Sequence, residues 1–297
     1  MPSVALATCE AFPNLDDVDR LLIPELEHLG IEGVPAVWDD ESIDWSAFDA
    51  VVLRATWDYP ERRDEFLAWL RRVDASTLLL NPYDVVAWNT DKRYLRDLAA
   101  ENVPIVSTRF IEPADDPEDW QPEAGYADFV VKPAVSAGSR DTERYAAADP
   151  RAAAHDHIRR LQAQGRTVMV QPYLDAVDTD GETAMLFLGG QFSHAIRKGA
   201  LLQRGVVGVT ISSLFLEESI DSRQATAEQV EVAHAAVAAI PGGFDRVLYA
   251  RVDLIAGPDG SPRLLELELT EPSLFLDHEI GAPGALARAI QARLASG

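Results

Sequence analysis

Two segments near the C-terminus alternate charged and apolar residues, and this pattern constrains the fold of the 297-residue chain more than any other. Successive side chains of a β-strand point to opposite faces. In VLYARVDLI, one face of the predicted strand carries Tyr249, Arg251 and Asp253. In LLELEL, the glutamates lie opposite the leucines; they are Glu266 and Glu268 against Leu265, Leu267 and Leu269. Each predicted strand therefore has one charged face and one apolar face.

The charged faces of these strands are predicted to meet. If Asp259 and Gly260 form a two-residue turn, the strands form a hairpin. Its facing pairs are Asp253 with Glu266 and Arg251 with Glu268. Three carboxylates this close repel one another unless a positive group lies among them, and Arg251 could neutralise only one. Such oxygen ligands suit a hard cation such as Mg²⁺. The alternatives are an exposed strand pair and, less favoured, a glycosidase with paired carboxylates.

The chain is strongly acidic, with 49 Asp and Glu residues against 26 Lys and Arg. This excess repels a phosphate backbone, so no nucleic-acid partner is expected. Cys9 is the single cysteine, which excludes a disulfide within the chain. No segment reaches the roughly 18 to 20 apolar residues of a membrane span, and the first residues lack the pattern of a signal peptide. We expect a cytoplasmic protein without a membrane partner; a homo-oligomer is left open.

Lysine is rare in this chain. Of the 26 basic residues only three are lysines, namely Lys92, Lys132 and Lys198. A compact ammonium group makes different contacts from a planar guanidinium, so these lysines are candidates for contacts that need an ammonium. Lys92 is predicted in the first turn of a helix, where exposed N–H groups favour an anion. Lys198 follows Arg197 at the end of a predicted strand. Scattered surface lysines are the alternative.

Short apolar strands alternate with amphipathic helices in the first part of the chain, which predicts an open parallel α/β sheet. A smaller lobe and a third lobe follow. The expected elements are strands over 3–8, 34–38, 50–53, 77–80, 128–131 and 167–170, helices over 15–29, 62–73, 91–100, 151–164, 227–240 and 284–295, a hairpin over 182–197 with a Gly-Gly turn, and strands over 247–255 and 263–269.

A loop of small residues follows Lys132, which ends the apolar run FVVK. The loop PAVSAGSR contains two hydroxyl groups and one glycine. Such a loop can bring backbone N–H groups close to phosphate oxygens. It is not a Walker A loop, and no G-x-G-x-x-G motif follows the first strand. Taken alone, such a loop more often is an ordinary turn.

A substrate pocket is expected at the carboxyl ends of the N-terminal strands, where open α/β sheets bind ligands. Arg54, Thr56 and Asp58 follow one such strand. Arg54 could hold a carboxylate and Asp58 an ammonium group, as an amino-acid-like substrate requires. A capped turn with a surface ion pair is the alternative.

Taken in order, these features resemble the ATP-grasp superfamily of carboxylate ligases over nearly the whole chain. They are a helix-start lysine, a strand-end lysine with its small-residue loop, QPYL, a basic strand end, and R-V-D and E-L-E thirteen residues apart. The resemblance implies an α/β and α+β fold with three parts. These are an open parallel α/β substrate-binding domain over 1–90, a small central lobe over 91–175 and a catalytic antiparallel-sheet lobe over 176–297.

The resemblance also implies a role for each matching residue. ATP would contact the phosphate lysines Lys92 and Lys132, the phosphate-covering loop of Ser136, Ala137, Gly138, Ser139 and Arg140, the adenine hinge of Gln171, Pro172, Tyr173 and Leu174, and the ribose candidates Asp178 and Glu182. Two Mg²⁺ ions would bind Asp253, Glu266 and Glu268. The last of these stands where many members have Asn. The transferring phosphate would be stabilised by Arg251, Arg197 and Lys198.

Within the superfamily, LRATWDY, LLNP, WNTDKRYL and VVKPAVSAGSRDT resemble the branch that contains the O-ureido-serine cyclo-ligase that forms D-cycloserine. This implies activation of a small, amino-acid-like substrate as an acyl phosphate, followed by attack of its own nitrogen to close an isoxazolidinone ring. O-Ureido-D-serine is the expected substrate. The alternatives are an amide-forming amino-acid ligase, a non-catalytic nucleotide-binding regulator and a phosphotransferase.

Overall fold

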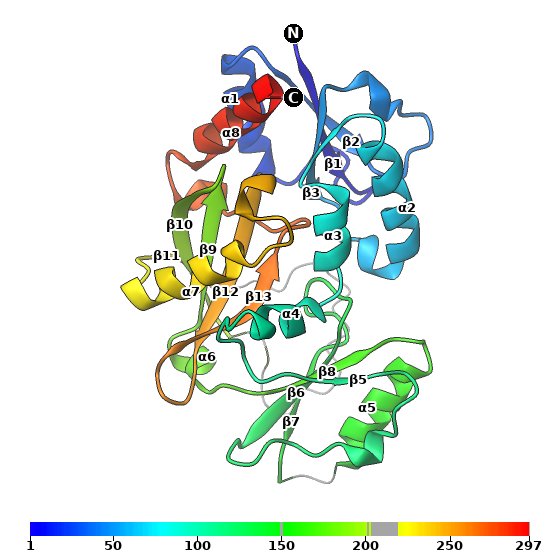
Figure 1. The fold of residues 1–297 in the computed structure, drawn as a ribbon, viewed down its shortest axis with the longest axis vertical. Coiled ribbons are helices and arrows are strands. Elements are labelled where there is room, and N and C mark those ends of the chain that lie inside the picture. Colours follow the sequence, from blue (N-terminus) through cyan, green and yellow to red (C-terminus); the bar gives the residue numbers. More distant parts are fainter. Residues whose placement is uncertain (149–150, 201, 203–218, 297) are drawn as a thin grey trace.

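Three β-sheets organise the chain, one in each of three lobes (Figure 1). The computed structural model describes residues 1–148, 151–200, 202 and 219–296. The N-terminal and central lobes each contain a four-stranded sheet, and the C-terminal lobe contains a five-stranded one. Within these ranges, every helix is too short or too polar to cross a lipid bilayer.

The N-terminal lobe confirms the predicted open parallel sheet. It consists of β1 (Ser3–Thr8), β2 (Glu32–Val37), β3 (Ala50–Ala55) and β4 (Leu78–Leu80), in the spatial order β2-β1-β3-β4 with every pairing parallel. Every residue of β3 is buried, as expected for an inner strand with both faces covered. The helices of this lobe are α1 (Leu22–His28), α2 (Arg63–Asp74) and α3 (Tyr83–Asn89).

The central lobe contains an antiparallel sheet covered by one helix. Its strands are β5 (Arg109–Ile111), β6 (Asp128–Pro133), β7 (Glu143–Ala146) and β8 (Val168–Pro172), in the order β5-β8-β6-β7. Helix α5 (Ala152–Gln162) packs Ile158 and Leu161 against Phe129 and Val131 of β6. The other face of the sheet is left to the cleft described below.

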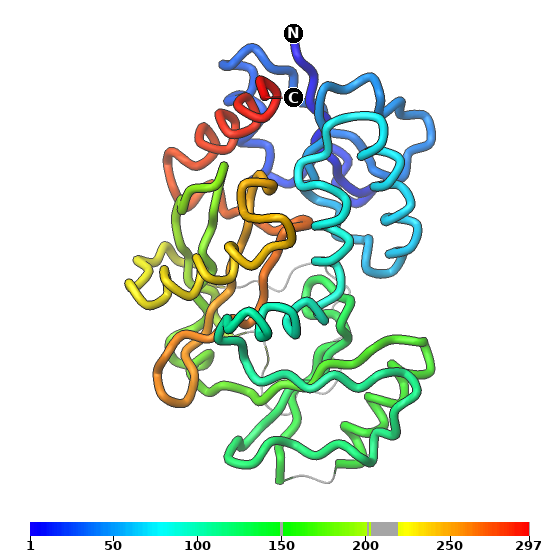
Figure 2. The backbone as a smooth tube through the Cα atoms, in the orientation of Figure 1, coloured from blue at the N-terminus to red at the C-terminus, as the bar shows by residue number. Residues whose placement is uncertain are grey.

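The C-terminal lobe contains an antiparallel sheet in the order β11-β10-β9-β12-β13. Its strands are β9 (Glu182–Leu188), β10 (Gln191–Lys198), β11 (Ile220–Arg223), β12 (Tyr249–Ala256) and β13 (Pro262–Glu268). Helices α4 (Tyr94–Ala100) and α7 (Ala227–Ala238) pack on the apolar side of β12 and β13. Helix α8 (Ala282–Ser296), red in Figure 2, lies against α1 of the N-terminal lobe. The apolar faces predicted from the alternating pattern are therefore buried, except at Leu265.

The predicted pairing of β12 with β13 is confirmed, but the predicted turn is wrong. Arg251 faces Glu268 and Asp253 faces Glu266. The loop between the strands is 258–260, because the Gly257 amide donates a hydrogen bond to the Ser261 carbonyl at 2.8 Å. Gly260 closes this loop with a φ of +79°, a conformation that glycine adopts without strain.

A bulge in β13 compensates for the longer loop. Asp253 pairs with Glu266, but the next residue, Leu254, pairs with Leu264, so Leu265 is the extra residue. Leu264 is fully buried in the apolar core, whereas Leu265 is only partly buried and lines the cleft. The prediction that Leu265 shares the core face with Leu267 is therefore wrong, because a bulge reverses the side of one residue.

Two predicted helices begin later than expected. The chain bends at Asp16, whose Oδ1 accepts a hydrogen bond from the Asp19 amide at 2.8 Å, and α1 begins only at Leu22. Similarly, α4 begins at Tyr94, so Lys92 lies in the turn before the helix and not in its first turn. The helix-dipole argument for Lys92 is thus incorrect, because Lys92 lies between the end of α3, a helix that was not predicted, and the first residue of α4.

Arg54 fastens the N-terminal lobe to the segment that follows β13. Its side chain is fully buried. Its Nη2 donates to Asp19 Oδ1 at 2.7 Å and to the carbonyl oxygen of Pro272 at 3.0 Å. A buried charge pair of this kind is costly to break, since the remaining partner stays desolvated. The pair fixes the side chain of Arg54, whose hydrogen bond to the Pro272 carbonyl connects the N-terminal lobe to the C-terminal lobe at the side of the cleft.

We expect Arg54→Met to lower the free energy of unfolding by about 3–5 kcal/mol, because it leaves Asp19 as a buried charge without its partner. Urea denaturation measures this change through the midpoint and slope. Arg20→Met is the matched control: Arg20 pairs with Asp17 on the surface, where 48% and 89% of the two side chains are exposed. That control should change stability by less than about 0.5 kcal/mol. Equal midpoints for the two variants would contradict the role assigned to Arg54.

Candidate active site

A cleft of about 430 Å³ lies between the central and C-terminal lobes, with residues of the N-terminal lobe at one side. All three lysines of the chain line it, as their rarity in the sequence suggests. Five acidic residues also line it: Glu182, Asp253, Glu266, Glu268 and Glu271. The cleft thus collects opposite charges in a protein whose surface is predominantly acidic.

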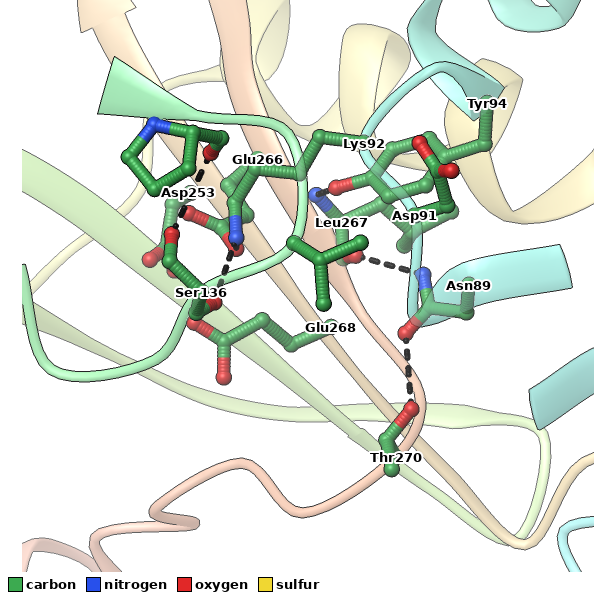
Figure 3. Close-up of polar contacts among 12 residues, drawn as sticks. Asn89, Asp91, Lys92, Tyr94, Ser136, Asp253, Glu266, Leu267, Glu268 and Thr270 are labelled. Atoms are coloured by element: carbon green, nitrogen blue, oxygen red, sulfur yellow. Dashed lines mark hydrogen bonds and ion pairs between the residues drawn. The ribbon is translucent and has the colours of Figure 1, made fainter. Parts of the chain in front are cut away.

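Two lysines bridge the carboxylates of the hairpin to neighbouring segments. Lys92 Nζ lies 3.1 Å from Glu266 Oε1 and donates to the Ser136 carbonyl at 2.8 Å, as Figure 3 shows. Lys198 Nζ lies 2.6 Å from Asp253 Oδ2 and 2.8 Å from Glu182 Oε2. The two ammonium groups come from different segments and meet the same face of the hairpin.

Arg251 completes the charge balance from within the hairpin. Its Nε lies 2.9 Å from Asp253 Oδ1, and its Nη2 also contacts Glu268. The expectation that Arg251 neutralises only one carboxylate is therefore corrected. Three basic side chains, not one, lie among the three carboxylates of the hairpin.

Burial and charge together set the protonation of these carboxylates. Burial raises the pKa of Glu268 to about 7; Glu266 and Asp253 add to the shift and Arg251 opposes it. For Asp253, burial also disfavours the charged form, but Arg251 and Lys198 outweigh it and lower the pKa. Burial lowers the pKa of Lys132, which lies in β6 and lines the same cleft, although Glu266 opposes this. The protonation of each group in this cluster therefore depends on the charges of the other groups.

The opposite end of the cleft is apolar. Its wall consists of a cluster of buried side chains and of Leu265, the extra residue of the bulge. The cluster contains Val106, Val130, Tyr173, Leu174, Val177 and Ile255. The guanidinium of Arg144 lies 3.3 Å from the centre of the Tyr173 ring, and its Nε donates to Asp128 Oδ2 at 2.6 Å. Tyr173 also donates to Asp178 Oδ1 at 2.5 Å. A flat heterocycle fits this end better than a charged group.

The predicted hinge and loop residues mostly reach the cleft. Gln171 to Leu174 line it, and the Gln171 Nε2 donates to Thr108 Oγ1 at 2.8 Å. The loop residues at the cleft are Ser136, Ala137, Gly138 and Ser139. Arg140 instead forms an ion pair with Glu61 of the N-terminal lobe. The small-residue loop thus bridges the charged end of the cleft and the N-terminal lobe.

Some predicted site residues are not brought to the cleft wall. Arg197 lies next to Lys198 on β10, where successive side chains alternate, and its Nε donates to the Asp180 carbonyl at 2.8 Å. Asp178 lies behind the hinge and accepts a hydrogen bond from Tyr173. Glu182 does line the cleft, through its ion pair with Lys198.

The prediction that Arg54, Thr56 and Asp58 line the substrate pocket is wrong. Arg54 and Thr56 are fully buried, and Asp58 accepts a hydrogen bond from Trp38 Nε1 at 2.9 Å inside the N-terminal lobe. The edge of the sheet where a ligand was expected is covered by the segment after β13. The residues of this stretch that line the cleft are Trp57 and Tyr59. The aromatic residues of the sequence TWDY were the signal that could have identified these two cleft residues.

Two residues that sequence reasoning missed hold β13 in place. Asn89 Nδ2 donates to the Leu267 carbonyl at 2.7 Å, and Asn89 Oδ1 accepts from the Leu269 amide at 2.7 Å. The Tyr94 hydroxyl accepts from the Leu267 amide at 2.9 Å (Figure 3). Because β13 is an edge strand, these side chains bond to backbone groups that no further strand pairs with. The two glutamates of β13 are thereby fixed against the cleft.

The donor set of the hairpin suits Mg²⁺, which prefers carboxylate oxygens. Asp253, Glu266 and Glu268 offer oxygen atoms only, on one face. In the described part of the chain, however, no three acidic, His or Cys side chains are already gathered closely enough to hold a metal ion. The carboxylate oxygens suit the ion by their chemistry. Because basic side chains lie against them, the lysines would have to move before the ion could bind.

Comparison with known proteins identifies the family. Residues 4–81 match the family described as D-cycloserine synthetase DcsG, N-terminal domain. The chain is 41% identical over 292 residues to the cycloserine biosynthesis protein DcsG of Streptomyces lavendulae, which covers 93% of this chain and 95% of that protein. The chain belongs to the DcsG family.

Solved structures establish the fold of this DcsG-family chain. The crystal structure of D-cycloserine synthetase DcsG matches with a TM-score of 0.87 and 36% identity, over 98% of this chain and 99% of that one. The ATP-grasp ligase PsnB, complexed with a phosphomimetic variant of its minimal precursor, Mg and ADP, matches with a TM-score of 0.63 and 22% identity, over 99% of both chains. The fold is ATP-grasp, as the sequence predicts, and the DcsG-family chain is a ligase that forms a carbon–nitrogen bond.

We expect Glu266→Gln to lower ATP-dependent turnover at least about 100-fold with the fold intact, because the amide removes one of the three carboxylates of the hairpin. Phosphate release measures turnover, and circular dichroism and thermal unfolding check the fold. Glu32→Gln, a substitution of an exposed residue of β2, is the matched control and should retain full activity. Full activity of Glu266→Gln would remove the argument for a metal site here.

Proposed function

We propose that this enzyme cyclises O-ureido-D-serine to D-cycloserine at the expense of ATP, which leaves as ADP and phosphate. One observation carries the proposal: the three lysines of the chain line the same cleft as the three carboxylates of the hairpin, within a chain 41% identical to a cycloserine biosynthesis protein. The substrate is a small molecule.

In this proposal ATP spans the two ends of the cleft. The apolar end with Tyr173 and Leu174 takes the adenine ring. The charged end takes the phosphates, which Lys92 would contact in place of Glu266 and which Lys132 would also contact. Asp253, Glu266 and Glu268 would hold two Mg²⁺ ions. When bound, Mg²⁺ neutralises charge that develops on the phosphate oxygens during transfer.

The proposed reaction has two bond-forming stages. The substrate carboxylate takes the terminal phosphoryl group of ATP, which yields an acyl phosphate and ADP. The ureido nitrogen next to oxygen then bonds to the acyl carbon and loses its proton, while the carbon–oxygen bond to phosphate breaks. Because the ring nitrogen of D-cycloserine carries no carbamoyl group, water must also cleave the ureido nitrogen–carbon bond. That cleavage releases the carbonyl as carbamate, which decomposes to carbon dioxide and ammonia.

The enzyme's own residues orient these groups and limit water. Arg251 and Lys198 lie beside Asp253, where they can stabilise negative charge on the transferring phosphate. The loop from Ser136 to Ser139 borders the charged end and can cover it, which protects an acyl phosphate from hydrolysis. Ring closure needs no acceptor amine, because the nucleophile belongs to the activated molecule.

Phosphate release from ATP with Mg²⁺ and O-ureido-D-serine as the only other substrate tests the proposed function. We expect stoichiometric release of phosphate and formation of D-cycloserine, identified by mass spectrometry. The L-isomer and a panel of single and paired amino acids are run in parallel. Release only with paired amino acids would make the enzyme an amide ligase, and ATP binding without any release would favour a regulatory protein.

A further inference from the structure

Glu271 is a cleft residue to which the reaction described above assigns no role. It follows β13 in the sequence TEPS and lines the cleft, although only 9% of it is exposed. Of the charged groups around it, Glu268 raises the pKa of Glu271 most, and Glu271 in turn raises the pKa of Tyr59 more than any other charged group does. Glu271 therefore lies at the charged end of the cleft, on the side of the N-terminal lobe.

The backbone that carries Glu271 is fixed by side chains from two strands of the C-terminal sheet and from the N-terminal lobe. Each carbonyl from Thr270 to Leu274 accepts a side-chain hydrogen bond. The donors, in order, are Tyr249 at 2.9 Å, Trp57 at 3.1 Å, Arg54 at 3.0 Å, Arg251 at 3.3 Å and His194 at 3.1 Å. A segment held at every carbonyl presents its side chains in a defined direction, as a binding group requires.

Glu271 differs from the other acidic residues of the cleft in its partners. Glu182, Asp253, Glu266 and Glu268 each form an ion pair with a lysine or an arginine. Among the described residues, no basic side chain forms an ion pair with Glu271, and no group donates a hydrogen bond to its carboxylate. Burial, and next the charge of Glu268, raise the pKa of Glu271 well above its usual range. Lys92 and Arg251 oppose this shift. The carboxyl group thus lacks a cation at ion-pair distance among the described residues.

The chemistry of the two substrates decides which of them meets Glu271. The phosphates of ATP are anionic, so they offer Glu271 no cation and would be repelled by its charged form. An amino-acid substrate carries one cation, its α-ammonium group, on the carbon next to the carboxylate that is phosphorylated. A partner for that ammonium must therefore lie near the phosphoryl-transfer end, beside the hairpin carboxylates, which is where Glu271 lies.

On the basis of the proposed function, we infer that Glu271 binds the α-ammonium group of the substrate and makes the enzyme specific for substrates that carry an α-amine. Trp57 and Tyr59 line the cleft from the N-terminal lobe and exclude water from this contact. A buried ion pair across an interface contributes to selectivity because a ligand without the charge leaves the carboxylate unpaired.

The test compares two substrates in wild-type enzyme, Glu271→Gln and Glu271→Asp. The second substrate is the analogue of O-ureido-D-serine with hydrogen in place of the α-amine, 3-(ureidooxy)propanoic acid. We expect Glu271→Gln to lower kcat/KM for the amino substrate about 30-fold or more, and to change kcat/KM for the analogue by less than about threefold. KM for ATP should not change, and Glu271→Asp should regain part of the preference. Glu32→Gln serves as the surface control.

Each outcome of this comparison decides a different point. Equal losses for both substrates, or a preference for the amine that Glu271→Gln retains, would overturn the inference while the proposed function stands. Absence of product from O-ureido-D-serine with wild-type enzyme would overturn the proposed function and the inference with it. Thermal unfolding checks that Glu271→Gln folds, which we expect because the substitution removes a buried carboxylate without a partner.

Discussion

The charge balance on the cleft face of β12 and β13 is the interaction on which the rest of the structure depends. Asp253, Glu266 and Glu268 could not stay together in a buried place without nearby cations. Lys92 arrives from the turn before α4 and Lys198 from the end of β10. The cluster thus joins the segment that leads into the central lobe to three strands of the C-terminal sheet, β10, β12 and β13, and the cleft forms around it.

The same balance explains how the site can be stable before ligands arrive and still bind them. Lys92 and Lys198 neutralise the carboxylates, and they carry the positive charge that attracts phosphates. When ligands bind, the lysines and carboxylates exchange ion-pair partners. The free-energy cost of this exchange is lower than that of placing new charges in a buried site, because each ion keeps an opposite charge beside it. The apolar end with Tyr173, steadied by Arg144, needs no such exchange and can be formed in advance.

Sequence reasoning predicted the facing pairs of the hairpin because strand alternation and a short loop leave little freedom. It reached the right pairs although the loop is one residue longer, since the bulge at Leu265 restores the register. It failed for Arg54 because that residue meets Pro272, more than two hundred positions later, and no local pattern encodes this contact. Glu271 was missed for a similar reason: its isolation becomes visible only when the partners of the other acidic residues are known.

A crystal structure with Mg²⁺ and a non-hydrolysable ATP analogue tests the central claim most directly. The account predicts Mg²⁺ bound by oxygens of Asp253, Glu266 and Glu268, with the ammonium group of Lys92 moved from Glu266 to a phosphate oxygen. It also predicts the adenine ring against Tyr173. The account would be contradicted by a nucleotide bound elsewhere, or by phosphates in the cleft with Lys92 still paired to Glu266.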